Sequence, residues 1–521
     1  MEGNGSGEDV RVSKFSMTQL AIDLDEQWPS LKYLGFGCYY AWIYLCYNSD
    51  VLFNWSSTGS SSVLLTMYLV STTGLSLVLI LAALFHKKAT PLIEGRAFTM
   101  VMALVATAST VMLSCASPLG PWNPVFLSGS FLTGVGTAFV ALRLGSVYSS
   151  VVARQAFMYT AGSFLFAGML YFVAVGIPFP ANMIVTACLP LLAALFSLTA
   201  NAHEGERHSR ADRVSIRELP SGFFFRLVLV IAVFSIVGGL VKGIMAVDQP
   251  FSMVNDSGSI IVFATGMVAI VLFLAVGVTV RDFDISRLYY PVIILACLGI
   301  LAVPLLGTFG VVQGQFVGVA YNLFILVVWC LLAHVSNRTD LPVVQVFGWG
   351  RGASGAGTTV GWAIGAASSS FLQSNPSAMV GLAVGMVFVL LIVSMVVLNE
   401  RTIGLALLKT RSDEDTHAPG EFFPSAGLDR RSSAPESSNR EGTWTKSCNE
   451  LADRCKLSDR ERDVLFLLSK GRTIDFISNE LGISFNTAKS HIRHVYVKVG
   501  VHSRQELLDI IEAGRRKGES A

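Results

Sequence analysis

Long apolar runs separated by short polar stretches occupy the first three quarters of the chain. Each run holds about twenty residues, the length of a helix that crosses the hydrocarbon core of a bilayer. The pattern predicts transmembrane helices at 31–47, 63–85, 97–116, 125–142, 155–177, 181–200, 223–245, 259–280, 289–306, 314–336, 347–372 and 378–398. We therefore expect an all-α, polytopic bundle of about twelve helices, embedded in a lipid bilayer, over residues 31–398.

Positive charge is confined to one side of these predicted helices. The N-terminal segment and the loops on its side carry 15 Lys and Arg residues, whereas the six opposite loops carry none. Positive loops stay in the cytoplasm during insertion. The segment 1–30, the central loop 201–222 and the C-terminus are therefore expected in the cytoplasm. Because residues 1–30 are polar and acidic, we expect no cleavable signal peptide.

The layout of the spans is symmetrical, with six before the loop 201–222 and six after it. Two six-helix halves joined by a cytoplasmic loop resemble the major facilitator superfamily of transporters. The loop between the second and third helices of that family carries G-x-x-x-D-[RK]-x-G-[RK]-[RK]. Here it reads H-K-K-A-T-P-L-I-E-G-R and lacks both the Asp and the paired basic ending. The resemblance implies the helical architecture. Because the loop motif of the family is absent from this loop, the resemblance does not support transport activity.

The composition changes after residue 398. The whole chain is 14% charged, against about 25% for soluble proteins, yet 20 of its 38 Lys and Arg residues follow position 398. Residues 399–447 lack apolar periodicity and, from 411 onward, consist mainly of Ser, Pro, Gly and charged residues, which predicts a flexible cytoplasmic linker. Its last 37 residues have an r.m.s. reach of roughly 30–37 Å.

Residues 448–521 carry the start and stop signals of four short helices. Ser458 and Glu461 have the spacing of a capping box. Two short helices joined by Gly-Ile-Ser, over about 473–499, fit a helix-turn-helix. In the second of these, Ala488, Ile492, Val495 and Val499 recur at steps that place them on the core side. The stretch 485–504 contains four Lys or Arg and no acid, a charge pattern that attracts phosphates.

Three segments of this region resemble the LuxR-type (GerE-type) DNA-binding domain. They read L-S-D-R-E-R-D-V-L-F-L-L-S-K-G, I-S-N-E-L-G-I-S-F-N-T-A-K-S-H-I and K-V-G-V-H-S-R-Q-E-L, and the match covers residues 456–515. Where the family usually has Ile-Ala and Thr-Val-Lys, this chain has Ile-Ser and Thr-Ala-Lys, which keeps small side chains at both places.

The resemblance implies a bacterial transcription regulator that binds double-stranded DNA and forms a homodimer through its fourth helix. The third helix then enters the major groove, where Lys or Arg donates to guanine. The residues aligned with base-reading positions are Lys489, Ser490 and Arg493. Those expected to contact phosphates, or groups within the domain, are Asn486, Thr487, His491, Lys498 and Arg504.

Lys242 lies near the outer end of the predicted seventh span, and Arg351 lies near the inner end of the eleventh. Ionisable residues at membrane depth often mark ligand pathways, so both are candidate ligand-binding residues. The alternatives are extension of the side chain to the nearby interface, or pairing of Lys242 with Asp248. Glycines repeat every four residues in the eleventh span, which favours close helix packing, with a moving hinge or the wall of a ligand cavity as the alternative.

No phosphate-binding loop, nucleophile elbow or metal-ligand spacing is present in the sequence, which predicts no enzyme activity, catalytic residue, cofactor or metal site. The favoured function is a one-component regulator in the bacterial inner membrane. Its membrane domain senses an unknown small-molecule effector, and its cytoplasmic domain binds promoter DNA. The alternatives are a transporter with a regulatory DNA-binding tail, or a membrane anchor for DNA.

Overall fold

The computed structural model describes residues 30–53, 61–200, 222–248, 254–279, 289–305, 310–397, 448–470, 477, 480–481, 485–501, 506–507 and 510. Apart from their terminal residues, the predicted N-terminal segment and central loop lie outside this range, as do linker positions 399–447 and Arg504. The chain divides into two compact units, residues 1–408 and 409–521. The elements described in both units are helices, as the all-α fold class predicts.

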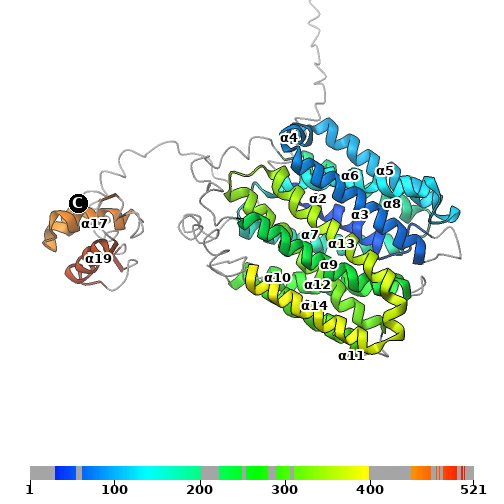
Figure 1. The fold of residues 1–521 in the computed structure, drawn as a ribbon. Coiled ribbons are helices and arrows are strands. Elements are labelled where there is room, and N and C mark those ends of the chain that lie inside the picture. The colour runs from blue at the N-terminus through cyan, green and yellow to red at the C-terminus, as the bar shows by residue number, and fades with distance from the viewer. Residues whose placement is uncertain are drawn as a thin grey trace, which may run out of the picture. The chain divides into compact units, whose positions relative to one another are not determined.

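Each of the twelve predicted spans corresponds to a helix of the first unit (Figure 1). The first half contains α2 (Leu31–Tyr47), α3 (Ser61–Leu84), α5 (Arg96–Ala116), α6 (Pro124–Tyr148), α7 (Ala153–Gly176) and α8 (Ala181–Leu198). The second half contains α9 (Phe223–Asp248), α10 (Val254–Thr279), α11 (Tyr289–Leu305), α12 (Gly310–Arg338), α13 (Val343–Ser374) and α14 (Pro376–Val397).

Within the described residues, nine helices are long and apolar enough to cross a membrane. The three long helices outside this set are α2, which has 17 residues, α11, whose apolar stretch is Val292–Ala302, and the glycine-rich α13. Most residues of α2 are buried, and it packs against α7 and α8. α13 packs against α9 and α3 but exposes Val360, Ile364 and Phe371.

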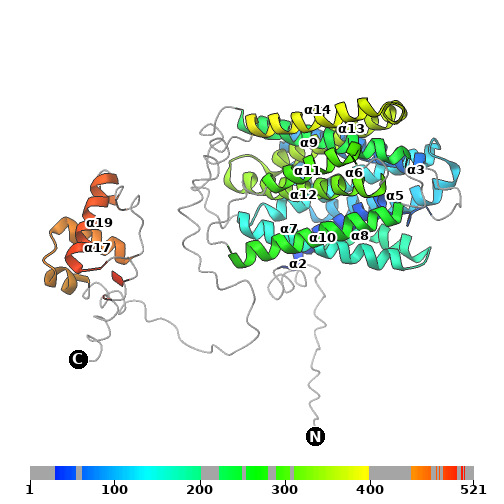
Figure 2. The same ribbon diagram turned by 90° about the horizontal axis from the view of Figure 1, so that it is seen from below.

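The two halves repeat one pattern of helix pairs. In each half the first helix packs against the fifth and sixth, the second against the fourth, and the third against the fourth and sixth. The halves meet through α3 with α13 and through α7 with α10, which are reciprocal second-to-fifth pairs. The arrangement therefore has an internal pseudo-twofold relation, and the blue-to-cyan and green-to-yellow helices form the two sides of the bundle (Figure 1). Figure 2 shows α14 at the outer edge of the second half.

Glycines let α13 approach α9 closely. A Cβ at Gly361 would lie 2.1 Å from the carbonyl oxygen of Ile236, and one at Gly365 would lie 2.2 Å from that of Leu240. The contact is reciprocal, because a Cβ at Gly243 of α9 would meet the Trp362 carbonyl at 2.4 Å. The glycine repeat therefore serves close helix packing, the first of the two alternatives predicted from the sequence.

Two local features differ from the sequence prediction. The polar stretch after the second span contains a further short helix, α4 (His86–Glu94), with Lys87, Lys88 and Leu92 exposed. The fourth span extends six residues beyond its predicted end, to Tyr148, so Arg143 lies inside α6 and is buried. Sequence reasoning placed Arg143 in a loop because a charge normally ends a hydrophobic span. Two charged residues lie near it, Arg96 with the same sign and Glu94 with the opposite sign.

The second unit has its own hydrophobic core. A helical segment 448–454 precedes α17 (Asp459–Ser469), and α17 packs against α19 (Phe485–Val499). The almost fully buried side chains of this core include Val464 and Leu465 of α17, Val495 of α19, Ile477 and Leu507. Figure 2 shows α17 and α19 side by side.

Candidate nucleic-acid interface and candidate ligand site

The start of α17 is fixed by the predicted capping box. The Ser458 hydroxyl accepts a hydrogen bond from the Glu461 amide at 3.4 Å, and Oε2 of Glu461 accepts one from the Ser458 amide at 2.8 Å. Two amides that lack partners within the helix are satisfied in this way. The Glu461 carboxylate is thereby held at a defined place, buried beneath α19.

Glu461 also binds the far end of α19. Nζ of Lys498 donates to Oε2 of Glu461 at 2.6 Å, and Nδ1 of His494 lies 3.8 Å from Oε1. The hydrogen bond from Lys498, followed by those from Ser458, lowers the pKa of Glu461 to about 2, although burial acts in the opposite direction. The carboxylate therefore remains charged at neutral pH and ties α19 to α17.

The other side of α19 faces the core. Val495 is fully buried, while Ile492 and Val499 are half-buried and pack against the cluster. Ala488 lies in the helix, but its side chain is outside the described residues. The helix ends at Gly500, which has φ +79°, and the amides of Gly500 and Val501 both donate to the Tyr496 carbonyl. Glycine is favoured at this end because it adopts positive φ without steric cost.

The residues predicted to contact DNA are distributed over α19. Ser490, Arg493 and Thr487 are exposed, and His491 is half-buried. Lys489 and Asn486 lie in the helix, with side chains outside the described residues. Lys498 contacts Glu461, one of the two kinds of partner expected for it.

Sequence reasoning missed one residue on this face. Val497 is 72% exposed, although valine is usually buried in so small a domain. It lies four residues after Arg493 and seven after Ser490, so the three share one side of α19. An apolar side chain there can contact the methyl group of thymine. The helical spacing from Arg493 would have revealed it.

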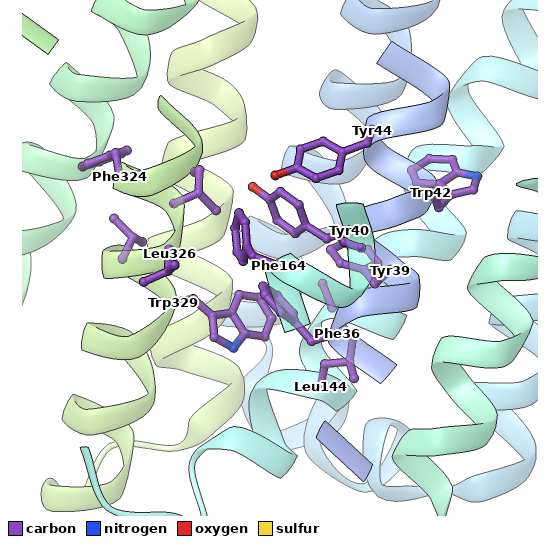
Figure 3. Packing of buried hydrophobic residues seen from close by; sticks show 14 of the residues in the cluster. Phe36, Tyr39, Tyr40, Trp42, Tyr44, Leu144, Phe164, Phe324, Leu326 and Trp329 are labelled. Atoms are coloured by element: carbon purple, nitrogen blue, oxygen red, sulfur yellow. The ribbon is translucent and has the colours of Figure 1, made fainter. Parts of the chain in front are cut away.

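The centre of the membrane unit is an aromatic cluster between the two halves. Tyr40 of α2 lies 4.3 Å, ring to ring, from Phe164 of α7, and Phe36 lies 4.3 Å from Trp329 of α12. Figure 3 shows the hydroxyl groups of Tyr40 and Tyr44 turned toward the helix that carries Phe324, Leu326 and Trp329. The cluster thus combines flat apolar rings with phenol groups at the plane where the halves meet.

Arg351 lies beside this cluster. It belongs to α13 and is only 8% exposed, with its guanidinium carbon 6.0 Å from the centre of the Trp329 ring. The Tyr39 hydroxyl is its polar neighbour. Within the described residues, its Nη1 atom has no hydrogen-bond partner. Burial of a guanidinium with incomplete hydrogen bonding is costly, so this position needs a functional explanation.

Lys242 of α9 contacts an aromatic ring of α12. Its Nζ is 4.6 Å from the centre of the Tyr321 ring, a cation–π contact. The Tyr321 hydroxyl is hydrogen-bonded to Thr358 of α13 at 2.8 Å, seven residues after Arg351. Pairing of Lys242 with Asp248 stays a prediction, because the Asp248 side chain lies outside the described residues.

Hydrogen bonds join the two halves at both ends of the bundle. At the end where α2 finishes, Asp50 and Asn255 exchange two hydrogen bonds, of 2.8 and 2.6 Å. At the other end, Asn337 donates to the Ser149 carbonyl at 2.7 Å and Arg154 to the Val276 carbonyl at 3.2 Å. These contacts hold the halves together above and below the aromatic cluster.

Comparison with known proteins identifies the second unit. The family described as bacterial regulatory proteins, luxR family, matches residues 455–511. The transcriptional activator protein EsaR of Pantoea stewartii subsp. stewartii is 38% identical over 68 residues, 13% of this chain and 27% of that protein. The HTH-type transcriptional regulator MalT of Yersinia pestis (strain Pestoides F) is 46% identical over 57 residues, 11% of this chain and 6% of that protein. Residues 455–511 therefore form a LuxR-family DNA-binding domain, and the chain spans less than a third of these relatives.

The membrane unit is similar to solved transporter structures at low identity. The human organic anion transporter MFSD10 (TETRAN) is 11% identical with a TM-score of 0.49, over 72% of this chain and 100% of that one. The major facilitator superfamily transporter FucP, in the outward conformation, is 12% identical with a TM-score of 0.45, over 70% and 97% of the two chains. At TM-scores below 0.5, neither similarity bears on what the unit does.

Proposed function

We propose that this protein is a membrane-bound one-component transcription regulator of the bacterial inner membrane. The observation that carries the proposal is the union, in one chain, of a LuxR-family DNA-binding domain with a bundle of membrane-crossing helices. A DNA-binding domain can work only on the cytoplasmic side, and the positive charge of the loops favours that orientation for both termini. The protein then carries a signal from the bilayer to a promoter without a second protein, and it is not an enzyme.

In the DNA complex, α19 lies in the major groove. Its exposed Ser490 and Arg493, together with Lys489, read base edges, and Val497 contacts a thymine methyl group. Asn486, Thr487, His491 and Arg504 bind phosphates and fix the register. Lys498 holds Glu461 instead, which keeps α19 at a constant angle to the rest of the domain.

The membrane unit, residues 31–398, acts as the sensor. Its two halves meet at an aromatic cluster flanked by Lys242 and Arg351, and a buried guanidinium with an unsatisfied donor is a binding group for a small molecule. A ligand shifts a two-state protein only through different affinities for the two states. The hydrogen bonds at the ends of the bundle are the contacts that such a change would break or form.

The signal reaches DNA through proximity. The composition of residues 399–447 predicts a flexible linker, and such a linker would not transmit a rigid rotation. The membrane unit therefore controls whether two DNA-binding domains are held close together, where they form a homodimer on a pseudo-twofold site.

Chromatin immunoprecipitation of the intact protein tests the proposal. It should identify discrete promoters, and transcription from them should change when an effector is added but not in a variant lacking residues 448–521. Uptake of the effector into vesicles would favour a transporter with a regulatory tail. Uniform DNA association without promoter preference would favour a membrane anchor.

A further inference from the structure

The interior of the membrane helices carries positive charge without an acidic partner. In the described part of residues 30–397, every acidic residue lies at a helix end or in a connection: Asp50, Glu94, Asp248, Asp256 and Asp340. Three basic residues lie more than one turn inside a long helix: Arg143, Lys242 and Arg351. Arg143 has both Arg96 and Glu94 nearby, whereas the other two contact neutral groups: the Tyr321 ring for Lys242, and the Trp329 ring and Tyr39 for Arg351.

Burying a guanidinium next to neutral groups costs free energy, because no opposite charge compensates for the water it has lost. Its cost falls when a carboxylate accepts two parallel N–H bonds from the guanidinium fork. Arg351 is suited to this, because Nη1 is unsatisfied and the side chain is fixed between Trp329 and Tyr39. Among the described residues of this unit, no acidic side chain lies in the interior of a long helix, so the anion proposed for Arg351 is that of a bound molecule.

The side chains near Arg351 indicate which other chemical groups that molecule carries. The rings of Tyr40, Phe164 and Trp329 gather at the contact between the halves (Figure 3). These rings are buried and pack against one another, so an aromatic ligand has to separate them and then stacks favourably between them. We propose, as an extension of the sensor function, that the effector is an aromatic carboxylate whose acid group binds Arg351 and whose ring lies among these side chains.

Lys242 provides a second polar contact at a different depth. Thr358, which binds the Tyr321 hydroxyl, follows Arg351 by seven residues, or about 10 Å along the helix. Lys242 lies on the Tyr321 ring. The two cations contact different rings, Arg351 that of Trp329 and Lys242 that of Tyr321, so in the proposed complex Lys242 contacts a polar substituent of the ligand ring and not the carboxylate.

The test measures thermal unfolding of the full-length protein in a neutral detergent. Millimolar benzoate and 1-naphthoate are compared with benzamide and 1-naphthamide, which keep the ring but lack the charge. The acids should raise the midpoint by roughly 1–4 °C and the amides should not. Equal effects of acid and amide, or no effect of either acid, would overturn the proposal.

Variants assign the effect to the site. Arg351→Gln should abolish the shift, Arg351→Lys should reduce it, and Lys242→Gln should reduce but not abolish it. Arg143→Gln is the matched control, because it removes a buried cation outside the cluster and should leave the shift intact. If Arg351→Gln does not fold, Arg351→Met replaces it. The proposal expects Arg351→Met to leave the ligand-free midpoint unchanged or raised, because it removes an unpaired charge, whereas a structural role predicts a lower midpoint.

Three further outcomes distinguish this proposal from related ones. If phosphatidylglycerol stabilises the protein through Arg351 and the acids do not, the site binds a lipid headgroup and the aromatic acid is excluded. If 1-naphthoate binds through Arg351 but leaves promoter activity unchanged, the ligand class stands and the sensor function fails. Regulation by an uncharged molecule with Arg351 dispensable would reject the ligand class and keep the sensor.

Discussion

Nζ of Lys498, near the end of α19, lies 2.6 Å from Oε2 of Glu461, in the first turn of α17. Glu461 simultaneously accepts the hydrogen bond that starts α17. One buried carboxylate thus sets both the beginning of one helix and the angle of the next. This contact holds α19, the helix that carries Arg493 and Ser490, in place against α17. In the proposed DNA complex those two residues read bases, and neither Glu461 nor Lys498 does.

The pH dependence of folding follows from this pair. The pKa of Glu461 is lowered to about 2, so its contribution is complete above the ordinary value near 4.5 and is lost as the pH falls toward 2. Glu461→Gln should lower the free energy of unfolding of residues 446–521 by about 1.5–3 kcal/mol at neutral pH and flatten its acid dependence. Urea unfolding at a series of pH values measures this. Asp463→Asn, at an exposed ion pair, is the control and should change stability by less than about 1 kcal/mol. Identical acid profiles for the Gln variant and the parent would exclude the pair as the cause.

Base reading by α19 can be tested with residues 446–521 alone, which bury their own core. Arg493→Ala, like Lys489→Ala, should weaken binding to the preferred site by about 1–3 kcal/mol and relax the sequence preference. Arg460→Ala, at an exposed position of α17, is the matched control and should leave the sequence preference intact. Band-shift titrations on specific and scrambled DNA make the measurement. An unchanged preference after loss of both α19 side chains would reject their role as readers.

Close packing of α13 on α9 predicts different costs for two mid-helix glycines. Gly361→Ala places a methyl group 2.1 Å from the Ile236 carbonyl oxygen, whereas the Cβ of Gly381→Ala meets nothing within 4 Å. The first substitution should destabilise the protein by roughly 1–3 kcal/mol, because the helices must separate. The second should be neutral. Thermal unfolding of both full-length variants in detergent decides the matter, and similar midpoints would contradict the observed contact.

Membrane orientation is the next prediction. Reporters fused after residue 30, within 201–222 and after Leu398 should all be active in the cytoplasm, because the positive loops lie on that side. A fusion within 373–377 should report the opposite side and is the control. A reporter after Leu398 that worked only outside the cytoplasm would overturn both the orientation and the proposed function.

Linker length distinguishes proximity from rigid coupling. Adding ten neutral residues near Pro435 should weaken the transcriptional response only slightly, because effective concentration falls slowly with tether length. Target-gene expression is measured across insertions of one to eight residues in the full-length protein. A response that rises and falls with the helical repeat of about 3.6 residues would show a rigid helical link and contradict the proximity model.

Local patterns explain how much of this architecture is predictable. The twelve spans and the capping box at Ser458 depend on neighbours within a few residues, since hydrophobic runs and helix caps are satisfied locally. The core spacing of Ile492, Val495 and Val499 is local in the same sense, and the structure buries that side. The same reasoning misplaced Arg143, because it took a charged residue as the end of a span, whereas α6 continues to Tyr148 and buries Arg143.

The sequence by itself determined the all-α fold class, the six-plus-six layout and the LuxR-type domain, because each is encoded in periodicity or in a contiguous motif. Tertiary structure alone decided which distant residues meet. Lys498 finds Glu461 across 37 residues, and Arg351 meets Trp329 and Tyr39 from three different helices. The same packing left Val497 exposed and brought Gly361 against Ile236. Such contacts depend on how helices pack against one another. The glycine repeat predicted a close approach at the eleventh span but not which helix it meets, because the partner is set by the three-dimensional packing.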